Sequence, residues 1–137
     1  PLDGPPRESI GIPTWHYGHE PPNVFPTAVA KYFANSERED GLLAIALHGV
    51  IFTPGSAGTI QEVFQDAAQN HYATPPGFAS PMVFYGETYW RRTKPVFPLL
   101  EQLAVGHGYG SLLFLSDRVE AIVDRIARFR PPPSSDE

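Results

Sequence analysis

The fold is decided by residues 50–64, which read Val-Ile-Phe-Thr-Pro-Gly-Ser-Ala-Gly-Thr-Ile-Gln-Glu-Val-Phe. The run 50–53 is short, continuous and β-rich, which is typical of a strand buried on both faces of a parallel sheet. A turn over 54–58 follows it. Apolar residues then recur at helical spacing and predict an amphipathic helix packed on that sheet; they are Ile60, Val63, Phe64, Ala67 and Ala68.

The same alternation continues toward the carboxyl terminus. Residues 81–85 and 112–115 predict two further buried strands, each followed by a helical pattern. Asp117 and Glu120 resemble a capping box at the start of the last helix. Alternating strands and helices predict an α/β fold, a Rossmann-like open parallel sheet with helices on both faces.

Toward the amino terminus the pattern is less regular. Residues 1–25 read as a Pro-rich extended segment, with Trp15, Tyr17 and Phe25 as anchors onto a neighbouring surface. A helix is expected from Pro26, and a second one after an N-cap at Asn35-Ser36. We therefore expect residues 26–130 to form the carboxyl-terminal part of a Rossmann-like nucleotide-binding domain, and 131–137 a polar tail.

Three strands make a small sheet with an open edge. The chain also begins at Pro1, and its one methionine is Met82. Both observations suggest a piece of something longer, whose first strands come from absent sequence or from another chain.

Composition excludes several classes of function. The chain has 137 residues and a formal net charge of −5, which argues against a nucleic-acid-binding surface. It has no cysteine, so thiolate chemistry is excluded, and no apolar run long enough to span a membrane. A cytoplasmic location fits this composition. His16 and His19 form an HxxH pattern without a third ligand in place, so no metal is expected.

The loop 54–59 carries the candidate chemistry, because ligands bind beyond the carboxyl ends of the strands in open α/β sheets. Gly55 and Gly58 permit left-handed or crowded backbone close to a ligand. The free N–H groups and dipole of the following helix attract an anion, and Ser56 and Thr59 add hydroxyl donors. Residue types and spacing alone favour a phosphate cradle and a plain tight turn equally.

Glu62 lies one helical turn beyond Thr59. A carboxylate does not help to bind phosphate, so it suggests contact with ribose hydroxyls or a water molecule, or else a solvated helix carboxylate. Asp66, one turn further, is expected on a solvated face of the same helix.

The nine residues 54–62 resemble the PGGxGTxxE signature of the LOG ("lonely guy") family, whose members are often mislabelled as lysine decarboxylases. Ser56 stands where the signature has its second glycine. The resemblance covers roughly residues 10–130 and corresponds to the carboxyl-terminal half of that family.

The resemblance implies a hydrolase, a nucleoside 5′-monophosphate phosphoribohydrolase that cleaves the N-glycosidic bond to free base and ribose 5-phosphate. Some family members act on cytokinin nucleotides. It implies that Glu62 is catalytic. Family members also carry an arginine in the helix before the motif strand, and Arg38 is the candidate for that second catalytic residue because it is the only arginine in that helix. No cofactor is expected. The resemblance also implies a homodimer with sites near the subunit interface. The 5′-phosphate would be held by Gly55, Ser56, Ala57, Gly58 and Thr59.

Two alternatives remain open. The chain could be a nucleotide-binding or sensing module that keeps the loop without hydrolysing. It could also be a fragment that depends on a partner chain, such as the missing amino-terminal half.

Overall fold

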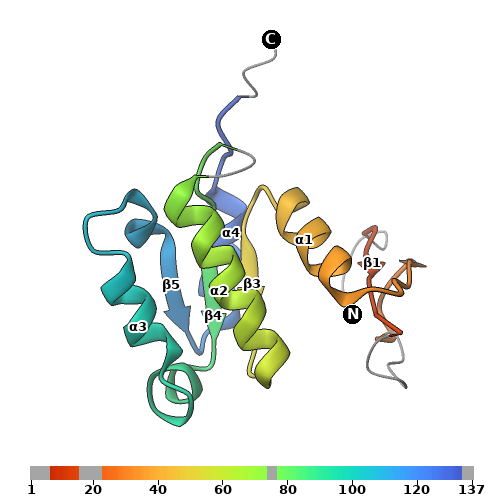
Figure 1. Ribbon diagram of the computed structural model, residues 1–137, viewed down its shortest axis with the longest axis horizontal. Coiled ribbons are helices and arrows are strands. Elements are labelled where there is room, and N and C mark those ends of the chain that lie inside the picture. Colours follow the sequence, from red (N-terminus) through yellow and green to blue (C-terminus); the bar gives the residue numbers. More distant parts are fainter. Residues whose placement is uncertain (1–6, 16–22, 74–76, 134–137) are drawn as a thin grey trace. The chain divides into compact units, whose positions relative to one another are not determined.

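The computed structural model describes residues 7–15, 23–73 and 77–133 (Figure 1). The chain divides into two units, residues 1–42 and 43–137, and each is described here by itself. The protein is of the mixed α/β class, and the strands in each unit pair in parallel. Within the described ranges, no helix is both long and apolar enough to cross a membrane.

The first unit holds a small parallel pairing. Strand β1 (Ile10–Gly11) pairs with β2 (Ala28–Val29). The Thr27 N–H donates to the Ser9 carbonyl at 2.7 Å, so the ladder continues beyond the strands. The helix predicted from Pro26 is therefore wrong. The backbone groups of this segment hydrogen-bond to an extended segment that is distant in sequence. Such pairing cannot be predicted from the spacing of local apolar residues.

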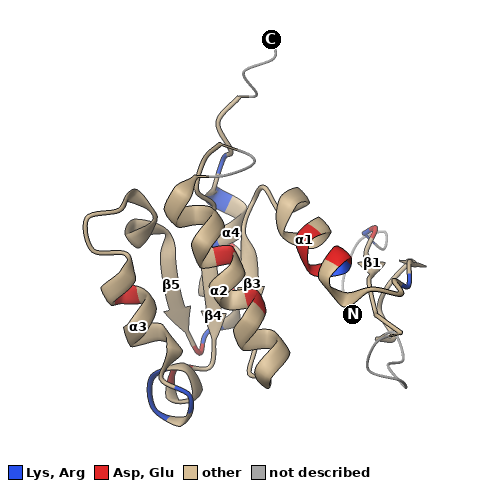
Figure 2. Ribbon diagram, viewed as in Figure 1, with Lys and Arg blue, Asp and Glu red and all other residues tan. Residues whose placement is uncertain are grey.

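Helix α1 (Asn35–Ile45) begins at the predicted N-cap region. Figure 2 shows acidic and basic residues mixed along its first turns. In the sequence, Arg38 is flanked by Glu37, Glu39 and Asp40. Such mixing offers no continuous basic face along this helix.

Two of the three predicted aromatic anchors fall within the described residues. Trp15 stacks on Phe33 with ring centroids 6.4 Å apart, and the Lys31 ammonium lies 3.8 Å from the Trp15 ring centroid. Phe25 is 82% exposed, so its ring is not packed as an anchor against the described residues of its unit. Tyr17 lies outside the described residues.

The second unit contains the predicted three-stranded sheet. Strands β3 (Val50–Phe52), β4 (Met82–Tyr85) and β5 (Leu113–Ser116) are parallel, in the order β3-β4-β5. All three predicted strands are confirmed to within one or two residues. Because the strands are parallel, the loops that follow them meet at one edge of the sheet.

Helices cover both faces of this sheet (Figure 1). Helices α2 (Ala57–Tyr72) and α3 (Val96–Leu103) lie on one face, and α4 (Val119–Arg128) lies on the other. Two short helices complete the unit, the π-helix η1 (Tyr89–Thr93) and the 3-10 helix η2 (Gly108–Leu112). This arrangement confirms an open parallel sheet of Rossmann-like type.

The core of the second unit is aromatic. Phe84 of β4 is fully buried, stacks on Phe52 at 5.1 Å, and meets Trp90 and Phe97 edge-on at 5.2 Å each. Edge-to-face and offset rings are the favoured geometries for such pairs. On the opposite face, Ile122 of α4 is buried. The core therefore fixes the strand ends from which the site loops emerge.

Asp117 does not cap α4. No side chain caps that helix at Arg118, its N-cap residue, and the Asp117 carboxylate instead accepts a hydrogen bond from the Glu87 N–H at 2.8 Å. The predicted capping box is wrong because a backbone donor from the neighbouring loop takes the carboxylate. The contact ties the loop after β4 to the loop after β5.

Candidate functional site

The first turn of α2 exposes its backbone donors. Ser56 is the N-cap residue in extended conformation, but its hydroxyl makes no capping hydrogen bond. Its carbonyl accepts from the Ile60 N–H at 3.1 Å, the first helical bond. The N–H groups of Ala57, Gly58 and Thr59 have no acceptor among the described residues. Unpaired N–H groups at a helix start, together with the helix dipole, are features that favour an anion.

Gly55 is required by crowding. A Cβ atom on Gly55 would lie 2.7 Å from the Thr59 Cβ, because the Thr59 side chain folds back over the turn. Neither Gly55 nor Gly58 has a positive φ, so the left-handed option expected for them is not used. The Thr59 hydroxyl thus lies beside the Gly55 backbone, at the start of α2.

The loop after β4 contacts the loop 54–59 and holds it in place. The Tyr89 hydroxyl donates to the Gly55 carbonyl, and Gly86, with φ +106, would bring a Cβ atom within 3.1 Å of the Pro54 Cγ. The Gly86 N–H donates in turn to the Ser116 carbonyl at 3.4 Å. Sequence reasoning missed Gly86 and Tyr89. Their position just after the second strand was the available signal, since that strand ends at the same edge.

Glu62 is partly buried in the second turn of α2. Residues three apart on a helix share a face, so Glu62 lies on the same side of α2 as Thr59. The loop and α2 thus bring Gly55, Thr59 and Glu62 together.

Asp66 is buried, not solvated as the sequence suggested. Its side chain is 3% exposed on the inward face of α2, beside Val63 and Ala67. Its Oδ1 accepts from the Asn70 amide at 3.3 Å, and its Oδ2 has no hydrogen-bond partner within the described ranges. The Asn70 side-chain Oδ1 accepts from the Ser80 N–H at 2.8 Å. Burial disfavours the charged carboxylate and raises the pKa of Asp66 to about 7.

Arg38 belongs to the first unit. Its Nε donates to the Ile12 carbonyl at 2.6 Å, and its Nη1 donates to Asn35 Oδ1 at 2.9 Å. These bonds hold the guanidinium within that unit, and the site described here consists of residues of the second unit alone.

His16 and His19 lie outside the described residues. Within the described part of the chain, no three His, Asp or Glu side chains gather as a metal ion would require.

Gly55→Ala should lower the free energy of unfolding by about 1–3 kcal/mol, because the added methyl must displace the Thr59 side chain. Urea denaturation measures this change. Gly108→Ala is the matched control: its Cβ would meet nothing within 4 Å, so its effect should stay within about 0.5 kcal/mol. Equal effects of the two substitutions would contradict the crowding at Gly55.

Comparison of the sequence with protein-family models and with curated proteins finds no match.

Proposed function

We propose that the protein hydrolyses the N-glycosidic bond of a nucleoside 5′-monophosphate, giving free base and ribose 5-phosphate. One observation carries the proposal. The first turn of α2 offers N–H donors that have no acceptor in the described part of the chain, and Glu62 follows them one turn later on the same side.

In this proposal the 5′-phosphate binds at the start of α2. The N–H groups of Ala57, Gly58 and Thr59 would donate to its oxygens, and the dipole of α2 favours the negative charge. The hydroxyls of Ser56 and Thr59 add donors. Because the phosphate is remote from the bond that breaks, its binding energy can position the ribose.

Glu62 acts on the ribose. As the bond from C1′ to the base nitrogen breaks, its electron pair leaves with the base and positive charge builds on the ribose ring. A carboxylate beside the ring stabilises that charge and orients a water molecule toward C1′. The water oxygen bonds to C1′ and loses a proton, and the departing base nitrogen gains a proton, so that the products are ribose 5-phosphate and the neutral base.

Arg38 remains a prediction from the sequence. The hydrogen bonds from its Nε and Nη1 occupy the guanidinium in the first unit, and the proposed reaction needs no proton or charge from it.

We also propose that the protein associates with a second chain. Its proposed location is the cytoplasm, where nucleotides are abundant. Among the described strands β3 pairs only with β4, and Ile51 on β3 is 46% exposed. A homodimer, or association with an amino-terminal half, would cover such an edge. Sedimentation of the purified protein distinguishes these states from a monomer.

The test of the proposed activity is a panel of nucleoside 5′-monophosphates and the matching nucleosides without phosphate. Free base and ribose 5-phosphate should appear from at least one monophosphate, and the matching nucleoside should react at least about 100-fold more slowly. Binding of a monophosphate without any turnover would instead support a non-hydrolysing nucleotide-binding module. If the protein neither bound nor hydrolysed any monophosphate, this result would contradict both the hydrolase and the nucleotide-binding module.

A further inference from the structure

The hydroxyl of Tyr89 reaches from η1 to the loop 54–59, where it donates to the Gly55 carbonyl. Tyr89 lies on a firm support. Its ring meets that of Trp90 edge-on, with the centroids 4.9 Å apart. Trp90 is fully buried, and its indole N–H donates to the Tyr85 carbonyl at 2.9 Å. The hydroxyl of Tyr89 is therefore well placed to fix the loop that it contacts.

This hydrogen bond fixes the direction of one backbone N–H group. The peptide unit between Gly55 and Ser56 is planar, and in a trans peptide the N–H points away from the carbonyl of the same unit. Because the Gly55 carbonyl is turned toward Tyr89, the Ser56 N–H is turned away from it. Ser56 is exposed, and its N–H has no acceptor among the residues that the structure describes. The loop thus presents a further donor on an exposed residue.

The Ser56 N–H directly precedes the N–H groups of residues 57–59 at the start of α2, which also lack acceptors in the described ranges. Successive backbone N–H groups can form a concave site for an anion. Ser56 has φ −110 and ψ −150, an extended conformation that any residue adopts. Serine therefore replaces the second glycine of the PGGxGTxxE signature without backbone strain.

We propose that Tyr89 is a positioning residue for the 5′-phosphate, which it serves by holding the Ser56 N–H as a fourth donor beside those of residues 57–59. This inference rests on the proposed function, because it needs a phosphate at the start of α2. Tyr89 does not touch the phosphate, since its hydroxyl proton is donated to the Gly55 carbonyl. Phenylalanine at this position keeps the ring but leaves the peptide after Gly55 free to rotate, so the loop loses a donor oriented in advance.

The test uses ribose 5-phosphate as the probe, because its binding can be measured whether or not the protein hydrolyses a nucleotide. Nuclear magnetic resonance follows the backbone amide signals of residues 56–59 during titration. In the wild type we expect the Ser56 signal to move downfield together with those of residues 57–59. In Tyr89→Phe the affinity for ribose 5-phosphate should fall about tenfold, and the Ser56 signal should move less than in the wild type.

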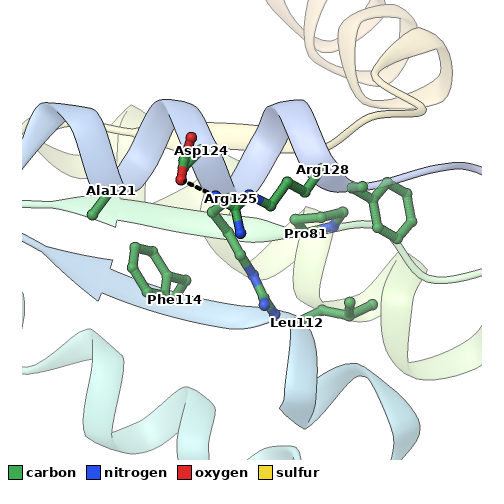
Figure 3. Close-up of a pocket in the computed structure, with 8 residues that line it drawn as sticks. Pro81, Leu112, Phe114, Ala121, Asp124, Arg125 and Arg128 are labelled. Atoms are coloured by element: carbon green, nitrogen blue, oxygen red, sulfur yellow. Dashed lines mark hydrogen bonds and ion pairs between the residues drawn. The ribbon is translucent and has the colours of Figure 1, made fainter.

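Two control variants should bind ribose 5-phosphate as the wild type does. Tyr72→Phe removes the same hydroxyl group from an exposed tyrosine at the far end of α2. Arg125→Met, like Tyr89→Phe, removes a side-chain donor from a loop carbonyl, that of Ser111. Arg125 lines a cavity of about 440 Å³ near the amino ends of β4 and β5 (Figure 3), at the edge of the sheet opposite to the loop 54–59. These variants separate the position of the donor from the mere loss of a hydrogen bond.

Three results would overturn the inference: unchanged affinity in Tyr89→Phe, a wild-type Ser56 signal that stays in place while those of residues 57–59 move, or no binding of ribose 5-phosphate at about 10 mM. The wild-type signals decide the question even if Tyr89→Phe does not fold. Base release from a monophosphate together with undiminished binding by Tyr89→Phe would overturn this inference alone. Binding that depends on Tyr89, without base release from any monophosphate, would overturn the hydrolysis alone.

Discussion

Glu62→Gln should lower the rate of base release from a nucleoside 5′-monophosphate by about 10³-fold, equivalent to about 4 kcal/mol of transition-state stabilisation. The amide keeps the size of the side chain but loses the negative charge that would stabilise the ribosyl cation. KM should change little, because the proposed phosphate contacts are made by the first turn of α2 and not by Glu62. Steady-state kinetics, with separation of base and ribose 5-phosphate, measures both quantities.

Glu120→Gln provides the matched control, since Glu120 is an exposed carboxylate in the first turn of α4. Its kinetics should equal those of the wild type. If Glu62→Gln retained the full kcat, Glu62 would not be the catalytic carboxylate. If it raised KM alone, Glu62 would bind the ribose without stabilising the transition state.

Asp66→Asn should remove a pH dependence of stability that amounts to about 4 kcal/mol between about pH 4 and pH 7. The pKa of Asp66 is raised from 3.8 to about 7 in the folded protein by burial. Between these values the folded chain holds a proton that the unfolded chain has lost. The free energy of unfolding of the wild type therefore falls as pH rises through this window, and it falls no further above it.

Urea denaturation of the wild type and of Asp66→Asn across this pH range measures the difference. The wild type should lose stability relative to the variant as pH rises, because the Asp66 Oδ2 has no partner to stabilise its charge. Glu120→Gln changes a carboxylate to an amide at an exposed position and should keep the wild-type profile. Parallel curves for wild type and Asp66→Asn would show that the buried carboxyl does not govern the dependence.

The sheet of the second unit could be predicted because its determinants are local. Residues 50–52 and 81–85 are uninterrupted apolar runs, and this pattern predicts β4 at the centre of the sheet as well as β3 at its edge. Helix α2 has a regular apolar stripe, and its start follows from the turn before it.

The remaining features depend on partners that are distant in sequence. β2 forms because the backbone near Ser9 supplies its hydrogen bonds, and Asp117 is taken by the Glu87 N–H. Asp66 was predicted to lie on a solvated face of the helix because its side chain is charged, although Val63 and Ala67 on either side of it are buried. In each case a long-range contact overrides the local preference.

The candidate site was predictable only in part. The glycine-rich turn and Glu62 are contiguous in sequence, so their proximity follows from one turn of helix. The contribution of Tyr89 depends on the order of the strands, because its hydroxyl reaches the Gly55 carbonyl only when β3 and β4 are neighbours.

The contacts between the loops after β3 and β4 have a consequence for protein engineering. Because Tyr89 binds the Gly55 carbonyl and Gly86 faces Pro54, the two loops constrain each other's residues. A graft of residues 53–59 into another α/β scaffold would need the segment 86–89 to be transferred with it. Among homologous chains, positions 54 and 86 should vary together, and so should positions 55 and 89.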